Sequence, residues 1–145
     1  MSDVRTSLFI AAKPERVWQV LTELRAWPEW NPVIPRIRGE LRVGETVRFR
    51  VRVESTPELG FAAKVVRCDA AKELAWRGGA PLIPALAWGE HYFRLEASGE
   101  GTMLTHGEDF GGLLALAMRS RSAHDRVTRS YEAMNRALKE RAERA

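Results

Sequence analysis

The sequence contains one cysteine, Cys68, among its 145 residues. A single thiol forms no internal disulfide and no cysteine-based zinc site, so both kinds of stabilised scaffold are excluded. No apolar run approaches the ~20 residues of a membrane-spanning helix, and the first residues lack the basic-then-apolar layout of a signal peptide. We therefore expect a cytoplasmic protein without an integral membrane segment, in which Cys68 is a small buried residue.

Signatures of catalysis and cofactor binding are also missing. The chain has no glycine-rich phosphate loop, no nucleophile elbow, no HExxH sequence and no dinucleotide-binding fingerprint. It has only three histidines, and they do not follow a metal-ligand spacing. We expect no cofactor and no metal ion, and the sequence leaves open whether the protein is an enzyme.

The net charge of +4 and the pI of about 9.7 raise the question of nucleic-acid binding. Arg48, Arg50 and Arg52 alternate with apolar residues, which is typical of the solvent face of a half-buried strand. The basic residues of 136–144 interleave with glutamates, as on the last turns of an exposed helix. Without a recognised binding motif, this distribution argues against a nucleic-acid partner.

The hydrophobic pattern predicts one α+β domain over residues 1–145, since 145 residues with 45% hydrophobic content suffice for one core. Apolar residues of period two predict a first strand, and after a short helical region they predict a six-strand meander. Residues 113–143 contain no proline or glycine and predict one long final helix. The predicted strands are 4–11, 34–41, 46–54, 61–68, 73–77, 88–97 and 102–110, and the early helical segments are 15–24 and 27–32.

Five short segments occur on these elements in order: IAAKPERVWQVL (10–21), WPEWNP (27–32), LAWRG (74–78), HYFRL (91–95) and GTMLTHGE (101–108). Together they resemble the polyketide cyclase/dehydrase-like branch of the SRPBCC superfamily, which also includes START lipid-transfer domains and the major birch pollen allergen. The resemblance implies a helix-grip fold, in which a curved antiparallel sheet of about seven strands wraps around a long C-terminal helix. It also implies two short helices after the first strand, and a hydrophobic cavity used by some members for binding and by others for catalysis.

Apolar residues of the predicted sheet and small residues of the final helix are candidates for lining this cavity. Simple core packing is the alternative for each aromatic residue. The candidate ligand-binding residues are Trp27, Trp30, Phe49, Val51, Trp76, Leu82, Trp88, His91, Phe93, Leu104, His106, Glu108, Phe110, Leu113, Ala117, Ser120 and His124.

Polar residues share the inward face of two neighbouring predicted strands. If Phe93 and Leu104 face the helix, period two also turns His91, His106 and Glu108 inward. The candidates for acid/base catalysis are therefore His91, His106 and Glu108. His124 approaches this group from the final helix. The alternatives are hydrogen-bonded histidines inside the barrel, a Glu108 paired with an arginine at the mouth, and a His124 that reaches solvent.

Residues 79–87 form an uncharged, mostly apolar loop that is costly to leave in water. It is either a lid over the cavity that contacts Leu113, Leu114 and Met118, or a contact in a dimer. The sequence thus leaves a monomer and a homodimer as alternatives.

Three functions follow from these features. The first is binding or transport of a hydrophobic small molecule, such as a lipid or an aromatic or polyketide-like compound, in the cavity. The second is a polyketide cyclase/dehydratase-type reaction by acid/base residues of the same cavity. The third is a protein-interaction module that uses the apolar loop and the basic face.

Overall fold

A seven-stranded antiparallel sheet is the centre of the computed structural model, which describes residues 3–54, 56–80 and 82–144. The ends of the predicted domain and position 81 of the predicted lid lie outside the described residues. The strand order is β1-β7-β6-β5-β4-β3-β2. The strands are β1 (Val4–Ile10), β2 (Arg36–Arg38), β3 (Thr46–Val51), β4 (Leu59–Asp69), β5 (Glu73–Gly79), β6 (Ala87–Ser98) and β7 (Gly101–Gly111).

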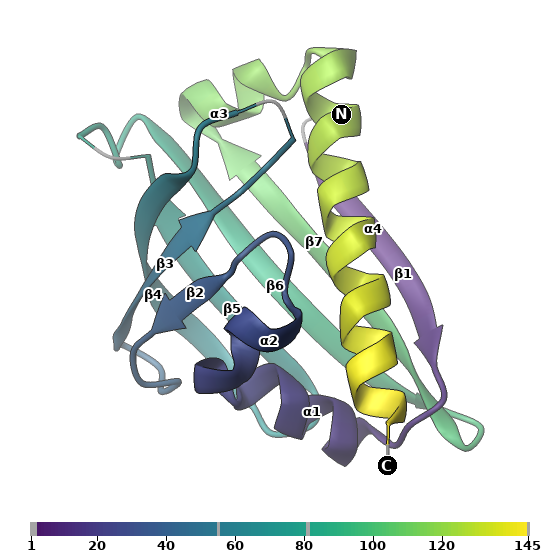
Figure 1. Ribbon diagram of the computed structural model, residues 1–145. Coiled ribbons are helices and arrows are strands. Elements are labelled where there is room, and N and C mark those ends of the chain that lie inside the picture. Colours follow the sequence, from purple (N-terminus) through teal and green to yellow (C-terminus); the bar gives the residue numbers. More distant parts are fainter. Residues whose placement is uncertain (1–2, 55, 81, 145) are drawn as a thin grey trace.

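The long helix α4 (Arg121–Glu143) lies across one face of the sheet and runs alongside β1 (Figure 1). Its buried side chains Tyr131, Met134, Leu138 and Ala142 follow each other at intervals of three and four residues, which places them on one stripe. The early helical region is α1 (Pro14–Thr22), the 3₁₀ turn η1 (Leu24–Ala26) and α2 (Trp27–Trp30), and it closes one end of the sheet (Figure 1). The predicted helix-grip architecture of the α+β class is confirmed.

The prediction of one continuous helix over 113–143 is wrong. The chain forms the short helix α3 (Gly112–Ala117), leaves helical geometry, and begins α4 at Arg121. Ser120 has extended backbone angles, and its hydroxyl accepts a hydrogen bond from the Ala123 N–H at 3.4 Å. A serine in this role satisfies a backbone donor of a new helix, so a helix boundary forms without proline or glycine.

Strand β2 is much shorter than the predicted strand 34–41. Pro35 precedes it and has no N–H for a ladder hydrogen bond. Gly39 follows it with a φ of 138°, a conformation that favours glycine. The alternating apolar pattern continues through both positions, but the backbone ends the pairing there.

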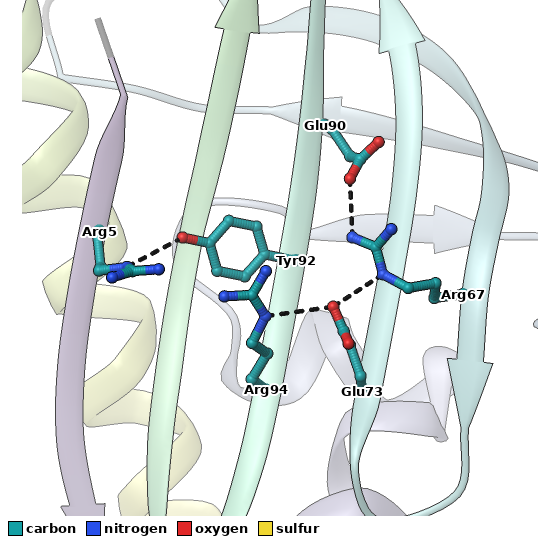
Figure 2. A network of polar contacts seen from close by, with 6 residues as sticks. All are labelled: Arg5, Arg67, Glu73, Glu90, Tyr92 and Arg94. Carbon is teal, nitrogen blue, oxygen red and sulfur yellow. Dashed lines mark hydrogen bonds and ion pairs between the residues drawn. The ribbon is translucent and has the colours of Figure 1, made fainter. Parts of the chain in front are cut away.

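Charged side chains on the face of the sheet turned away from α4 pair with one another. Arg67 forms ion pairs with Glu73 at 2.8 Å and with Glu90 at 2.7 Å, and Glu73 also contacts Arg94 at 3.3 Å (Figure 2). Part of the basic charge is thus balanced within the sheet itself. Among the described residues, no helix combines the length and the apolar character needed to cross a bilayer.

Candidate functional site

An internal cavity of about 220 Å³ lies between the inner face of the sheet, helix α4 and the segment that contains α3. Its wall is apolar over most of its extent and is formed by residues such as Val51, Phe61, Ala63 and Val127. Polar side chains gather at one end. The cavity therefore has the composition of a small-molecule site, with an apolar wall and few polar groups.

His91, Glu108 and Tyr131 form the polar end of the cavity. His91 on β6 and Glu108 on β7 are directly opposed in the sheet register, and the His91 Nδ1 atom lies 3.9 Å from Glu108 Oε1. Tyr131 extends from α4 toward the sheet, and its hydroxyl donates a hydrogen bond to Glu108 Oε1. Two strands and one helix thus bring three titratable groups to one point.

A chain of buried hydrogen bonds continues behind this polar end. His91 Nε2 lies 2.7 Å from His106 Nε2, and His106 Nδ1 lies 2.6 Å from Asn135 Oδ1. Asn135 Nδ2 donates to the Thr6 hydroxyl at 2.7 Å, and that hydroxyl donates to the backbone carbonyl of His106 at 2.7 Å. The network joins α4 to β1, β6 and β7 and satisfies polar groups that would be costly to bury alone.

Burial changes the protonation of these groups. Loss of water raises the pKa of Glu108 to about 7, although the hydrogen bond from Tyr131 acts in the opposite direction. Loss of water lowers the pKa of His106 to about 4, against a smaller opposite effect of Asn135, and lowers that of His91 well below its usual value. The same cause raises the pKa of Tyr131 well above 10. At neutral pH both histidines are neutral, and Glu108 is close to the midpoint of its titration.

A glycine on β6 makes room for the Glu108 carboxylate. A Cβ atom at position 89 would overlap Glu108 Oε2, because Gly89 lies beside that side chain at the cavity wall. Glycine is unfavourable in the middle of a strand, and close approach of another group is one reason for its presence there. Gly89 therefore belongs to the site as the residue that admits the carboxylate.

The structure brings six of the sequence-predicted residues to the cavity: Phe49, Val51, Trp76, His91, Glu108 and Phe110. Trp27, Phe93, Leu104 and His106 also face inward but are buried in the core without lining the cavity. They lie deeper along their elements, where side chains fill the space. For these four, the alternative of core packing describes the position better than ligand contact.

The remaining predicted residues lie elsewhere. Leu82 is 99% exposed, Leu113 is also exposed, and Ala117 and Ser120 face solvent around the break between α3 and α4. His124 Nε2 hydrogen-bonds to the Asp3 carbonyl at 2.8 Å, away from the cavity. Trp30 packs on Trp27, and the Arg77 guanidinium covers the ring of Trp88.

Helix α3 covers the cavity, which is the position that the sequence analysis assigned to the loop 79–87 as a lid. Leu114 and Met118 line the cavity, whereas Gly79 is its only lining residue from the described part of the loop 79–87. The predicted contact with Leu113 exists, but as a backbone hydrogen bond to the Leu86 carbonyl at 2.7 Å. The exposed part of the loop instead borders an open groove of about 790 Å³ beside Arg36, Arg38, Arg48 and Arg50. This groove adjoins the cavity, because both are lined by Phe49, Phe61, Ala62 and Gly79.

Sequence reasoning missed Tyr131, Asn135 and Thr6. Tyr131 lies at the helical spacing of the apolar residues of the predicted final helix, so the pattern alone indicates core packing and gives no role to its hydroxyl. Asn135 is only 2% exposed and lies four residues after Tyr131, on the same helix face. A polar residue at that spacing within an apolar stripe was the available signal for a buried polar partner.

Comparisons with known proteins identify the family of the chain and proteins of similar fold. The profile of a family described as polyketide cyclase / dehydrase and lipid transport matches residues 1–143. No curated protein matches the sequence. Many solved structures match the fold.

Three of these structures illustrate the range. The Zhui aromatase/cyclase from Streptomyces sp. R1128 has a TM-score of 0.76 and 20% identity over 98% of this chain and 93% of its own. The Aha1 dimer from Colwellia psychrerythraea has a TM-score of 0.73 and 21% identity over 99% and 97% of the two chains. Ara h 8.0201 has a TM-score of 0.71 and 14% identity over 97% and 96%. At these identities the similarity establishes the fold.

Proposed function

Since the chain belongs to the polyketide cyclase/dehydrase and lipid transport family, we propose that it binds a compact, largely apolar small molecule in the internal cavity. The observation that carries this proposal is the apolar cavity that ends in His91, Glu108 and Tyr131. Buried titratable groups at the end of an apolar cavity are costly for stability and are typical of ligand-binding or catalytic sites. A ligand would place its rings against the apolar wall and a polar substituent at this end.

The size of the cavity restricts the ligand. At about 220 Å³ it is smaller than the roughly 300–1,000 Å³ common for small-molecule pockets, so it favours one or two fused rings over a long-chain lipid. Trp76 supplies a large aromatic surface at the wall. An aromatic compound with one polar substituent therefore fits the site best.

Filling the cavity should weaken ligand binding without changing its polar end. Ala63 lines the cavity and is 4% exposed, so Ala63→Leu would occupy ligand volume. We expect the affinity for the probe 1-naphthol, measured by isothermal titration calorimetry, to fall at least about tenfold. Ala97→Leu makes the same change at an exposed position of β6 and should leave affinity unchanged. Wild-type protein that does not bind naphthol or related bicyclic compounds would contradict the proposal, as would equal affinity in the two variants.

One observation favours an additional catalytic role. Glu108 has a pKa of about 7 and lies near His91, so its carboxylate and its acid form are both populated at neutral pH. A group with this pKa can take a proton from carbon next to a carbonyl and return one. Such a step is the chemistry of the second function considered from the sequence, a cyclase or dehydratase.

Exchange of carbon-bound hydrogen tests this role directly. In D₂O, we expect the wild-type protein to accelerate replacement of the protons next to the carbonyl of 1-tetralone, followed by NMR. Glu108 would take each proton, and a deuteron from solvent would replace it on the same carbon. Glu108→Gln should lower the catalysed rate about 100-fold. A rate that is unchanged in this variant would exclude Glu108 as the base.

A further inference from the structure

The directions of the buried hydrogen bonds can be assigned from one end of the network. The backbone carbonyl of His106 can only accept a hydrogen bond, so the Thr6 hydroxyl, at 2.7 Å, must donate to it. Because the hydroxyl has only this one proton to donate, its oxygen must accept the hydrogen bond from Asn135. The nitrogen of the Asn135 amide is therefore the atom at 2.7 Å from Thr6. This fixes the orientation of the amide, which leaves its oxygen facing His106.

The same reasoning assigns the tautomers of both histidines. The Asn135 oxygen accepts, so the proton of neutral His106 is on Nδ1, which lies 2.6 Å away. His106 Nε2 is then without a proton and accepts a hydrogen bond at 2.7 Å from His91 Nε2–H. A neutral His91 with its proton on Nε2 has a free lone pair on Nδ1.

This lone pair belongs to a residue of the cavity wall and has no hydrogen-bond partner among the described residues. The carboxylate atom Glu108 Oε1 lies 3.9 Å from it, which exceeds hydrogen-bonding distance. The His91 ring is stacked near Phe93 and Tyr131, with ring centres at 5.0 and 5.1 Å, so its rotation is restricted. The acceptor therefore has a fixed position at the polar end of the cavity.

We propose that Thr6, Asn135 and His106 hold His91 in its Nε2–H tautomer, so that His91 Nδ1 accepts a hydrogen bond from a phenol or enol hydroxyl of the ligand. This inference rests on the proposed function and specifies its ligand class. His91 contacts the ligand, whereas Thr6, Asn135 and His106 are positioning residues that act through it. An otherwise similar ligand without a hydroxyl leaves the buried acceptor unsatisfied and binds more weakly.

The tautomers can be measured in the ligand-free protein. Long-range ¹H–¹⁵N correlation spectra distinguish protonated from unprotonated ring nitrogens. We expect His106 to carry its proton on Nδ1 and His91 to carry its proton on Nε2. In Asn135→Leu the acceptor for His106 is lost, and both histidines should show mixed tautomers. A wild-type His91 protonated on Nδ1 overturns the inference, even if no variant folds.

Binding of a matched pair of compounds tests the ligand class. We expect wild-type protein to bind 1-naphthol about tenfold more tightly than 1-fluoronaphthalene, which has no hydroxyl. This preference should decrease in Asn135→Leu. Equal binding of both compounds would overturn the inference while leaving the proposed function intact. Binding of neither compound would count against the proposed function, and the tautomer measurement would still decide whether the network orients His91.

Discussion

Replacing Trp27 with alanine is expected to lower the free energy of unfolding by about 3 to 5 kcal/mol. Trp27 is completely buried, and its Nε1–H donates to the Leu21 carbonyl at 3.1 Å. Its ring centre lies 6.3 Å from that of Trp76 and 6.4 Å from that of Phe93. Removal of the indole would leave a large gap in the core and an unpaired carbonyl.

Urea unfolding followed by far-ultraviolet circular dichroism would measure this effect. Trp30→Ala is the matched control, because Trp30 lies on the same short helix but is only half-buried. Its Nε1 has no hydrogen-bond partner in the described part of the chain. We expect the control to cost about 1 to 2 kcal/mol less than Trp27→Ala. A similar cost in both variants would show that Trp27 is not the structural support that its burial indicates.

The inward placement of the polar residues could be predicted because it depends only on strand periodicity. Side chains of a strand alternate between faces, so Phe93 and His91 had to share a face, as did Leu104 and Glu108. The depth along the strand could not be predicted in the same way. Phe93 and Leu104 pack in the core, whereas His91 and Glu108 line the cavity. This difference depends on where α4 and the early helices cross the sheet.

The helix break and the buried network could not be predicted from the sequence, for different reasons. Ser120 begins α4 through a local hydrogen bond, but most serines in helical patterns do not act as caps, and no proline or glycine marked the position. The role of Asn135 depends on Thr6, which is 129 residues away in the chain. Only the packing of α4 against β1 brings the two side chains together.

Replacing Glu108 with glutamine is expected to raise the free energy of unfolding by about 3 kcal/mol at pH 8 and to change it little at pH 4. In the folded protein the pKa of Glu108 is about 7, against an ordinary value of 4.5. Between these values the folded state binds more protons than the unfolded state, so stability is lost as the pH rises. One pKa unit corresponds to about 1.4 kcal/mol, which gives the expected magnitude.

Denaturant unfolding of both proteins at several pH values would measure this difference. Glutamine retains an oxygen that accepts from Tyr131, so the variant removes the charge and keeps the contact. The buried histidines have the opposite pH dependence: because their pKa values are lowered, they reduce the free energy of unfolding as the pH falls below 6.5. This effect is the same in both proteins. Glu132→Gln, at an exposed position of α4, is the matched control and should show no such pH-dependent gain. A Glu108→Gln difference that is constant with pH would show that the carboxyl does not titrate near neutrality.

A higher free energy of unfolding in Glu108→Gln bears on function, because it implies that the wild-type carboxyl destabilises the fold near neutral pH. Glutamine would fill the same space beside Gly89 and keep the hydrogen bond from Tyr131, so folding alone does not require a carboxyl here. A residue that destabilises the fold where an isosteric neutral one would serve is characteristic of a functional site. If Glu108→Gln is more stable at pH 8 and also loses the exchange activity toward 1-tetralone, the titrating proton has a chemical role. If stability increases while 1-naphthol binding is retained and no exchange activity exists in the wild type, the cavity is a binding site.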